Sequence, residues 1–84
     1  MIEEGSLGAL HPPRDFIDGG RVLLWCVSHN CHYSIPVGSP SLVVLKEKAW
    51  FSNGKKPEQI EMVHVHIGGL PYRIRADWLH PISS

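Results

Sequence analysis

Residues 63–75 read VHVHIGGLPYRIR, in which two alternating runs of apolar and polar side chains flank a Gly-Gly pair. Strict alternation predicts strands with one buried face and one exposed face. Glycine adopts positive φ angles without strain, and a two-residue hairpin turn needs such angles at both central positions. We therefore predict an antiparallel hairpin whose turn is Gly68 and Gly69, with Ile67 opposite Leu70.

The register of this hairpin sorts its side chains into two faces, because directly opposed residues share a face. The apolar face collects Val63, Val65, Ile67, Leu70, Tyr72 and Ile74. The other face collects Met62, His64, His66, Pro71, Arg73 and Arg75. A shift of one residue would mix the two sets and bury charge, so the pattern and the turn favour the same register. Pro71 lacks an N–H for a strand on its other side, which predicts an edge or a strand start there.

Length and charge limit what the chain can be. Its 84 residues form at most one domain, with a modest core and only shallow or shared pockets. Eight basic residues balance eight acidic ones, so no overall field attracts nucleic acid or an anionic membrane. No apolar run reaches the roughly 18 residues that a spanning helix needs, and the start lacks a signal-peptide pattern. With only two cysteines, this predicts reduced thiols and a cytoplasmic location.

The remaining sequence predicts a flexible N-terminal arm over residues 1–19 and a β-domain over 20–84. The arm is rich in Gly and Pro and has no sustained period, apart from a helical turn expected at residues 14–17. The first strand is expected over 21–27, a continuous apolar run that suits burial on both faces or a place at an interface. After it we expect a long loop over 28–41, a strand over 42–51, a turn over 52–57, the hairpin strands, a single turn over 76–79 and a short strand over 80–82.

This order of elements resembles the SH3-like small β-barrel. Most of the resemblance lies in residues 72–82, YRIRADWLHPI, which look like the fourth strand, the one-turn 3₁₀ helix and the fifth strand of such barrels. The resemblance implies an all-β, SH3-like barrel of about five short strands. Proteins with this fold bind peptides or nucleic acids, and one group is a small oligomeric enzyme, so the fold alone assigns no function.

That enzyme group, the plasmid-borne type II dihydrofolate reductases, is similar to this chain in size and outline. Its active-site strand carries a Gln-Ile-Tyr element, whereas the matching positions here hold Tyr72, Arg73 and Ile74. The residues for that activity are therefore absent. The outline still suggests a self-standing phage or mobile-element protein that forms a homo-oligomer.

The polar face of the hairpin is the first candidate binding surface. It carries His64, His66, Arg73 and Arg75, and arginine suits bidentate contact with carboxylate or phosphate. Protonation of the histidines near pH 6 would strengthen binding of an acidic partner. The alternative is the ordinary solvated side of an antiparallel sheet. Nucleic acid is a further alternative, although a neutral chain offers few contacts that neutralise phosphates.

Aromatic residues near the predicted loops form a second candidate surface. Tyr33, Trp50 and Trp78 could grip a proline-rich peptide as SH3 domains do, although the acidic loop that accompanies such a groove is not evident. An interface role in a dimer suits Trp25, Trp50 or Phe51 equally well.

Cysteine and histidine residues supply the third candidate site. Zinc prefers such ligands, and Cys26, His29, Cys31 and His32 lie within seven residues, with His64 and His66 in reach if their strands are neighbours. The spacing matches no standard zinc motif, so we predict no metal and no cofactor here. Cys31 beside His32 supplies the residue types of a nucleophile and its base, but no orienting carboxylate is apparent.

Taken as a whole, the sequence predicts a small, non-catalytic module that binds a protein partner. Two alternatives stay open. One is a small oligomeric enzyme or zinc-binding protein built on the cysteine and histidine cluster, and the other is a nucleic-acid-binding module.

Overall fold

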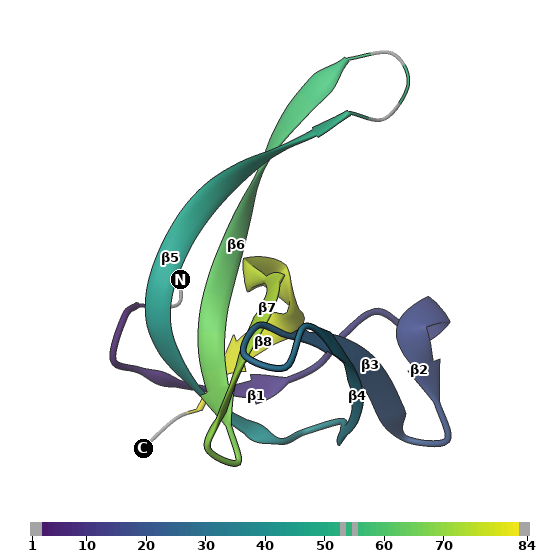
Figure 1. Ribbon diagram of the computed structural model, residues 1–84, viewed down its shortest axis with the longest axis vertical. Helices are drawn as coiled ribbons and strands as arrows, with labels where there is room; N and C mark the ends of the chain where they lie inside the picture. Colours follow the sequence, from purple (N-terminus) through teal and green to yellow (C-terminus); the bar gives the residue numbers. More distant parts are fainter. Residues whose placement is uncertain (1–2, 53, 55, 83–84) are drawn as a thin grey trace.

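The computed structural model describes residues 3–52, 54 and 56–82, and these form an all-β fold without an α-helix. Eight strands and two single 3₁₀ turns follow one another along the chain (Figure 1). In order they are β1 (Leu7–Leu10), η1 (Arg14–Phe16), β2 (Ile17–Asp18), β3 (Arg21–Cys26), β4 (Cys31–Pro36), β5 (Pro40–Ser52), β6 (Pro57–Ile67), β7 (Leu70–Arg75), η2 (Ala76–Trp78) and β8 (Leu79–Pro81). The predicted all-β class is confirmed. The described part of the chain has eight strands rather than about five.

All eight strands belong to one antiparallel sheet. Their order is β2-β3-β7-β6-β5-β1-β8, and β4 pairs with the other edge of β3. The sheet curls on itself, as the ribbon shows in Figure 1. It surrounds a single core. This core consists of Leu10, Val22, Leu24, Cys26, Ile35, Val43, Val63, Val65, Ile67, Tyr72, Ile74 and Leu79.

The predicted hairpin is confirmed as β6 and β7. Ile67 pairs with Leu70, and the pairing continues without a shift to Met62 opposite Arg75. Both turn glycines have positive φ, 58° at Gly68 and 83° at Gly69, as a tight hairpin turn requires. The apolar face of this hairpin lies on the core, where it supplies five of the buried residues.

The N-terminal segment differs from the flexible arm predicted over residues 1–19. Residues 7–10 form β1, which pairs with β5 on one side and with β8 on the other. Leu10 is completely buried, and β2 pairs with β3 across the predicted domain boundary. The partners of β1 lie far along the chain, and a four-residue strand is too short to show a period, so local patterns did not reveal it.

The segment over residues 28–41 also differs from prediction. Instead of a long loop, it contains β4, which pairs with β3 from Arg21–Pro36 to Cys26–Cys31. A four-residue loop joins them, with Asn30 in the left-handed region at a φ of 55°. Pro36 is the last residue of an edge strand, where its missing N–H is tolerated. Proline and glycine signals on this segment therefore mark strand ends rather than a loop.

The longest strands, β5 and β6, extend beyond the body as a curved two-stranded hairpin, called the projecting hairpin (residues 47–61) (Figure 1). Its last described pair is Ser52 with Pro57, while Asn53 and Lys55 of the predicted turn lie outside the described residues. The predicted single turns before β2 and β8 are confirmed as η1 and η2. Within residues 3–52, 54 and 56–82, no helix has the length and apolar character needed to cross a membrane.

Candidate functional site

Strand register places side chains from five strands in one line on the outside of the sheet. His32 pairs with Trp25, Trp25 with Arg73, Arg73 with His64, and His64 with Leu45. Directly opposed residues share a face, and the residues beside them along β3, β6 and β7 point into the core. We call this side of the sheet the outer face. A second line on it contains Leu7, Leu42, His66 and Pro71.

Large apolar side chains are exposed on the outer face. Leu23 is 65% exposed and Trp25 is 38% exposed, although both belong to β3, whose alternate residues are buried. The predicted strand therefore has one covered face and one open face. Leu42 and Leu45 add exposed apolar groups from β5. Contiguous patches of exposed apolar side chains mark interaction surfaces, whereas singly scattered ones are normal on any protein.

A β-bulge increases the apolar character of this face. The pairing of β5 with β6 shifts between Val43 and Leu45, so one extra residue is inserted in β5. As a result, the consecutive residues Val44 and Leu45 are both exposed, at 42% and 46%. The bulge also moves the following residues of β5 to the opposite side of the sheet.

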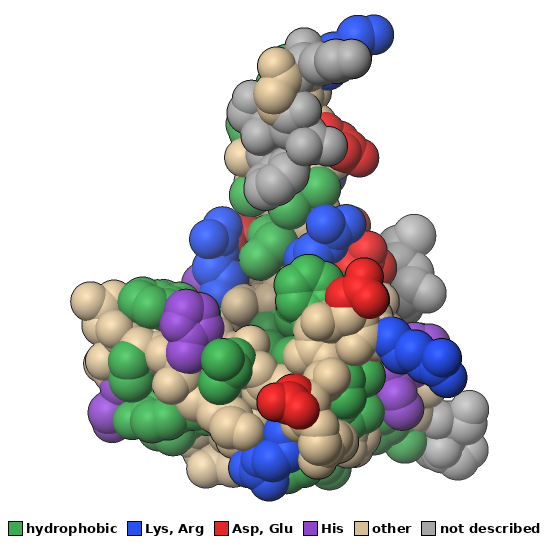
Figure 2. Space-filling model, turned by 90° about the vertical axis from the view of Figure 1, so that its right-hand side faces the viewer, with side chains coloured by type: hydrophobic (Ala, Val, Ile, Leu, Met, Phe, Trp, Pro, Cys, Tyr) green, Lys and Arg blue, Asp and Glu red, His purple; other side chains and the backbone are tan. Residues whose placement is uncertain are grey.

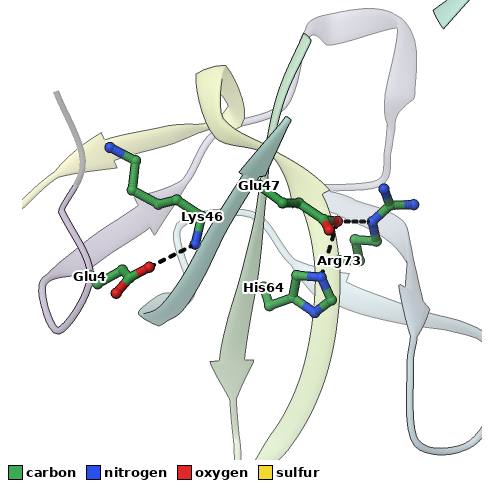
Figure 3. Close-up of polar contacts among 5 residues, drawn as sticks. All are labelled: Glu4, Lys46, Glu47, His64 and Arg73. Atoms are coloured by element: carbon green, nitrogen blue, oxygen red, sulfur yellow. Dashed lines mark hydrogen bonds and ion pairs between the residues drawn. The ribbon is translucent and has the colours of Figure 1, made fainter. Parts of the chain in front are cut away.

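One of those residues, Glu47, neutralises the predicted basic face. Its carboxylate accepts hydrogen bonds from Arg73 Nε and from His64 Nε2, the latter over 3.1 Å (Figure 3). The hydrogen bond from Arg73, with help from His64, lowers the pKa of Glu47 despite the opposing effect of partial burial. Sequence reasoning missed Glu47 entirely, because no local pattern places it beside residues that lie 17 and 26 positions away.

The second arginine of that face is paired as well. Arg75 donates from Nε to Asp77 Oδ1 over 3.2 Å and from its terminal nitrogen to Asp77 Oδ2 over 3.1 Å. A further carboxylate, Glu4, accepts from the backbone N–H of Lys46 at 3.2 Å and fastens the N-terminal segment to β5 (Figure 3). His64, Arg73 and Arg75 therefore occupy the predicted face, but both arginines are already paired with carboxylates of the same chain, and His64 shares the carboxylate of Glu47.

Figure 2 shows the side of the molecule on which β2 and β3 lie in Figure 1. Hydrophobic and histidine side chains are interspersed over the body. Basic and acidic groups lie next to one another around the base of the projecting hairpin. The structure contains an ion pair between Lys46 and Glu61, at 3.4 Å. The charged groups thus form local pairs rather than a field of one sign.

The three aromatic residues predicted to form a peptide groove lie in different parts of the fold. Tyr33 is on β4 and contacts the ring of His29, with 5.7 Å between the ring centroids. Trp78 is in η2 and packs against Phe16 at 5.0 Å. Trp50 is on the projecting hairpin and is 70% exposed. Among the described residues, no ring-to-ring contact joins the three.

The sheet divides the predicted cysteine and histidine cluster. Cys26 is buried on the core side, opposite Cys31, whereas His32 lies on the outer face against Trp25, with 5.1 Å between ring centroids. His64 and His66 also belong to the outer face. Across residues 3–52, 54 and 56–82, no three His, Cys, Asp or Glu side chains are grouped so that they could hold a metal ion.

One hollow on the surface is open rather than enclosed. It has a volume of about 460 Å³ and lies between β6 and the segment η2–β8, with Glu58, Glu61, Arg75 and Asp77 among its lining residues. Binding pockets for small molecules are usually concave and mostly apolar. This hollow differs from such pockets in being open and partly lined by charged side chains. No family model, curated protein or solved structure matched the chain.

Proposed function

We propose that this chain is a small non-catalytic module that binds a protein partner through its outer face. One observation carries the proposal: Leu23, Trp25, Leu42 and Leu45, from two strands separated by β7 and β6, are exposed on the same side of the sheet. Protein interfaces combine apolar and polar groups, and Trp and Arg supply much of their binding energy. Trp25 beside Arg73 fits that pattern.

The charges on this face favour a protein partner over nucleic acid. Binding of a nucleic acid depends on cations that are free to neutralise phosphates. Here Arg73 is held by Glu47 and Arg75 by Asp77, so each phosphate would have to displace a carboxylate. The chain also has no net positive charge. A partner with a complementary apolar surface needs no such exchange.

The scaffold we propose for this module is an SH3-like barrel in the cytoplasm. The 3₁₀ turn η2 between β7 and the short β8 supports this architecture. The strands β1 and β2 and the projecting hairpin are additions to the five-strand plan. An origin in a phage or mobile element stays a prediction of the sequence.

The test compares two variants that remove exposed apolar groups from different places. Leu23→Glu with Leu45→Glu alters the outer face, whereas Trp50→Glu alters the projecting hairpin. Sedimentation velocity first tests whether the partner is a second copy of the chain. Affinity capture with quantitative mass spectrometry then compares wild type with both variants, after circular dichroism has verified that each is folded.

We expect to capture proteins that wild type and Trp50→Glu retain equally. The outer-face double variant should retain these proteins at least roughly tenfold less, as expected when interface hot spots are lost. Equal retention by all three chains would contradict the proposal. Loss on Trp50→Glu alone would move the binding surface to the projecting hairpin. Retention of DNA or RNA that weakens steeply with salt would favour the nucleic-acid alternative instead.

A further inference from the structure

The two cysteines of the chain face each other at the end of the β3–β4 hairpin. Cys26 is the last residue of β3, Cys31 is the first of β4, and the two are direct register partners. Opposed residues in antiparallel strands have Cα atoms about 4.5–5.5 Å apart. A disulfide needs a Cα separation of about 4.4–6.8 Å, so this pair satisfies the requirement without movement of the backbone. Both thiols are free in the structure.

The loop between the cysteines holds them in place. The N–H of Asn30 donates to the carbonyl oxygen of Cys26 over 2.9 Å, which closes the loop. On the other side, the N–H of Val27 donates to the carbonyl oxygen of Pro71 over 3.0 Å, which ties the start of the loop to β7. The two thiols are therefore presented to each other by a fixed backbone.

The surroundings of Cys26 favour its thiolate. Its Sγ lies 3.5 Å from Ser28 Oγ and 3.6 Å from His29 Nδ1, and these two side-chain atoms are 2.9 Å apart. Burial acts to raise the pKa of the Cys26 thiol, but the hydrogen bonds from Ser28 and His29 outweigh it and lower the pKa. The thiolate is the reactive form in thiol–disulfide exchange.

The two thiols differ in their access to solvent. Cys26 is completely buried, whereas Cys31 is partly exposed at the edge strand β4. A small disulfide from solution can therefore reach Cys31 first. Cys26 lies behind it with its charge stabilised, which is the arrangement of a thiol that resolves a mixed disulfide.

We propose that Cys26 and Cys31 form a reversible dithiol–disulfide site that exchanges with a low-molecular-weight disulfide. In the first step, the Cys31 thiolate attacks one sulfur of the small disulfide, whose S–S bond breaks and releases one thiol. In the second step, the Cys26 thiolate attacks Cys31 Sγ, the mixed disulfide breaks, and the second small thiol leaves. The chain loses two electrons and two protons, and the small disulfide gains both as it becomes two thiols.

Intact-mass spectrometry after acid quenching tests this proposal with reduced full-length protein and oxidised glutathione as the probe. We expect wild type to lose two hydrogen atoms, to carry no lasting glutathione and to stay unlinked to other chains. Cys26→Ser should accumulate one glutathione on Cys31, because the resolving thiol is gone. Cys31→Ser should react roughly tenfold more slowly than wild type, because its remaining thiol is buried.

A variant that keeps both thiols provides a test that does not depend on correct folding of the serine variants. His29→Ala should slow the second step at neutral pH, and the rate should recover as the pH is raised and Cys26 ionises without help. A pH-independent rate in His29→Ala would contradict the role assigned to the imidazole. Wild type that keeps one or two stable glutathiones, or that forms disulfide-linked dimers, would overturn the proposal.

Discussion

Two neighbouring hairpins, β6–β7 and β3–β4, build most of the outer face but are held in different ways. In the first, both strands have a partner on each side, since β5 flanks β6 and β3 flanks β7. In the second, β4 has a partner along one edge only, and β3 pairs with β7 at just two positions, Trp25–Arg73 and Cys26–Tyr72. The β6–β7 hairpin is the centre of the sheet, while β3–β4 is a flap joined to it along a short seam.

This difference also separates the chemistry of the two hairpins. The central hairpin presents His64 and Arg73, and both donate hydrogen bonds to the carboxylate of Glu47 on β5. The flap presents the exposed side chains of Leu23 and Trp25 and the paired thiols at its end. Residues at sheet edges open locally at lower cost than central ones. The flap therefore carries both proposed sites, the exposed apolar residues on its outer side and the thiol pair at its end, and of these only Cys26 belongs to the core.

The largest expected effect separates the two sides of the flap. Leu24 is 2% exposed on β3 and its neighbour Leu23 is 65% exposed, so the two leucines form a matched pair. Leu24→Ala should lower the free energy of unfolding by about 2–5 kcal/mol, because it leaves a cavity in the core. Leu23→Ala should change it by no more than about 0.5 kcal/mol. Urea titration of both variants measures the difference, and similar losses would show that the outer face is covered within the chain.

A smaller effect is expected at the turn of the central hairpin. Gly69 has a φ of 83°, and no atom lies within 4 Å of the position that a β-carbon would take. A side chain at this position would therefore lower stability through its unfavourable backbone conformation and not through a clash with neighbouring atoms. Gly69→Val should lower stability by about 1–2 kcal/mol, whereas Gly69→Asn should cost less because asparagine tolerates the left-handed region. Equal melting temperatures for the two variants would argue against a strained turn.

The same contrast explains which parts of the fold were predictable. The β6–β7 hairpin could be predicted to the residue, because its Gly-Gly turn and its alternation are local signals that agree. The strand β1 was not found, since it has only four residues and its partners lie far along the chain. The strand β4 was not found although it is as long as β7. Proline residues near each of these strands gave a sequence pattern typical of a loop. Local signals therefore identified the central hairpin more fully than the strands around it.

The candidate site was predictable to the same extent. Placing His64 and Arg73 on one face followed from the hairpin register and is correct. Glu47 could not be placed, because alternation counted from the buried Val43 would put it inside the core. The bulge between Val43 and Leu45 reverses that count and brings Glu47 to the outer face. A single inserted residue therefore decides whether the predicted basic face is charged or neutralised.

The smallest expected effect tests this neutralised centre through its pH dependence. Arg73 and His64 lower the pKa of Glu47 in the folded chain, so the folded state binds its proton less readily than the unfolded state does. The stabilisation is therefore fully present above the unfolded pKa, about 4.3, and is lost as the pH falls from there through the folded pKa. Because the three side chains are 25–41% exposed, we expect Glu47→Gln to cost less than about 1 kcal/mol at pH 7.

Denaturation with urea at pH 7 and at several values below pH 4 measures this difference between wild type and Glu47→Gln. The gap in stability should close as the pH falls, because wild type then also loses the charge on Glu47. Glu61→Gln provides the matched control, since Glu61 pairs with Lys46 outside the Glu47 contact. A gap that stays constant with pH would mean that Glu47 acts through packing. In that case the charges of His64 and Arg73 would be free for an acidic partner, and the contrast between the neutral centre and the apolar flap would fail.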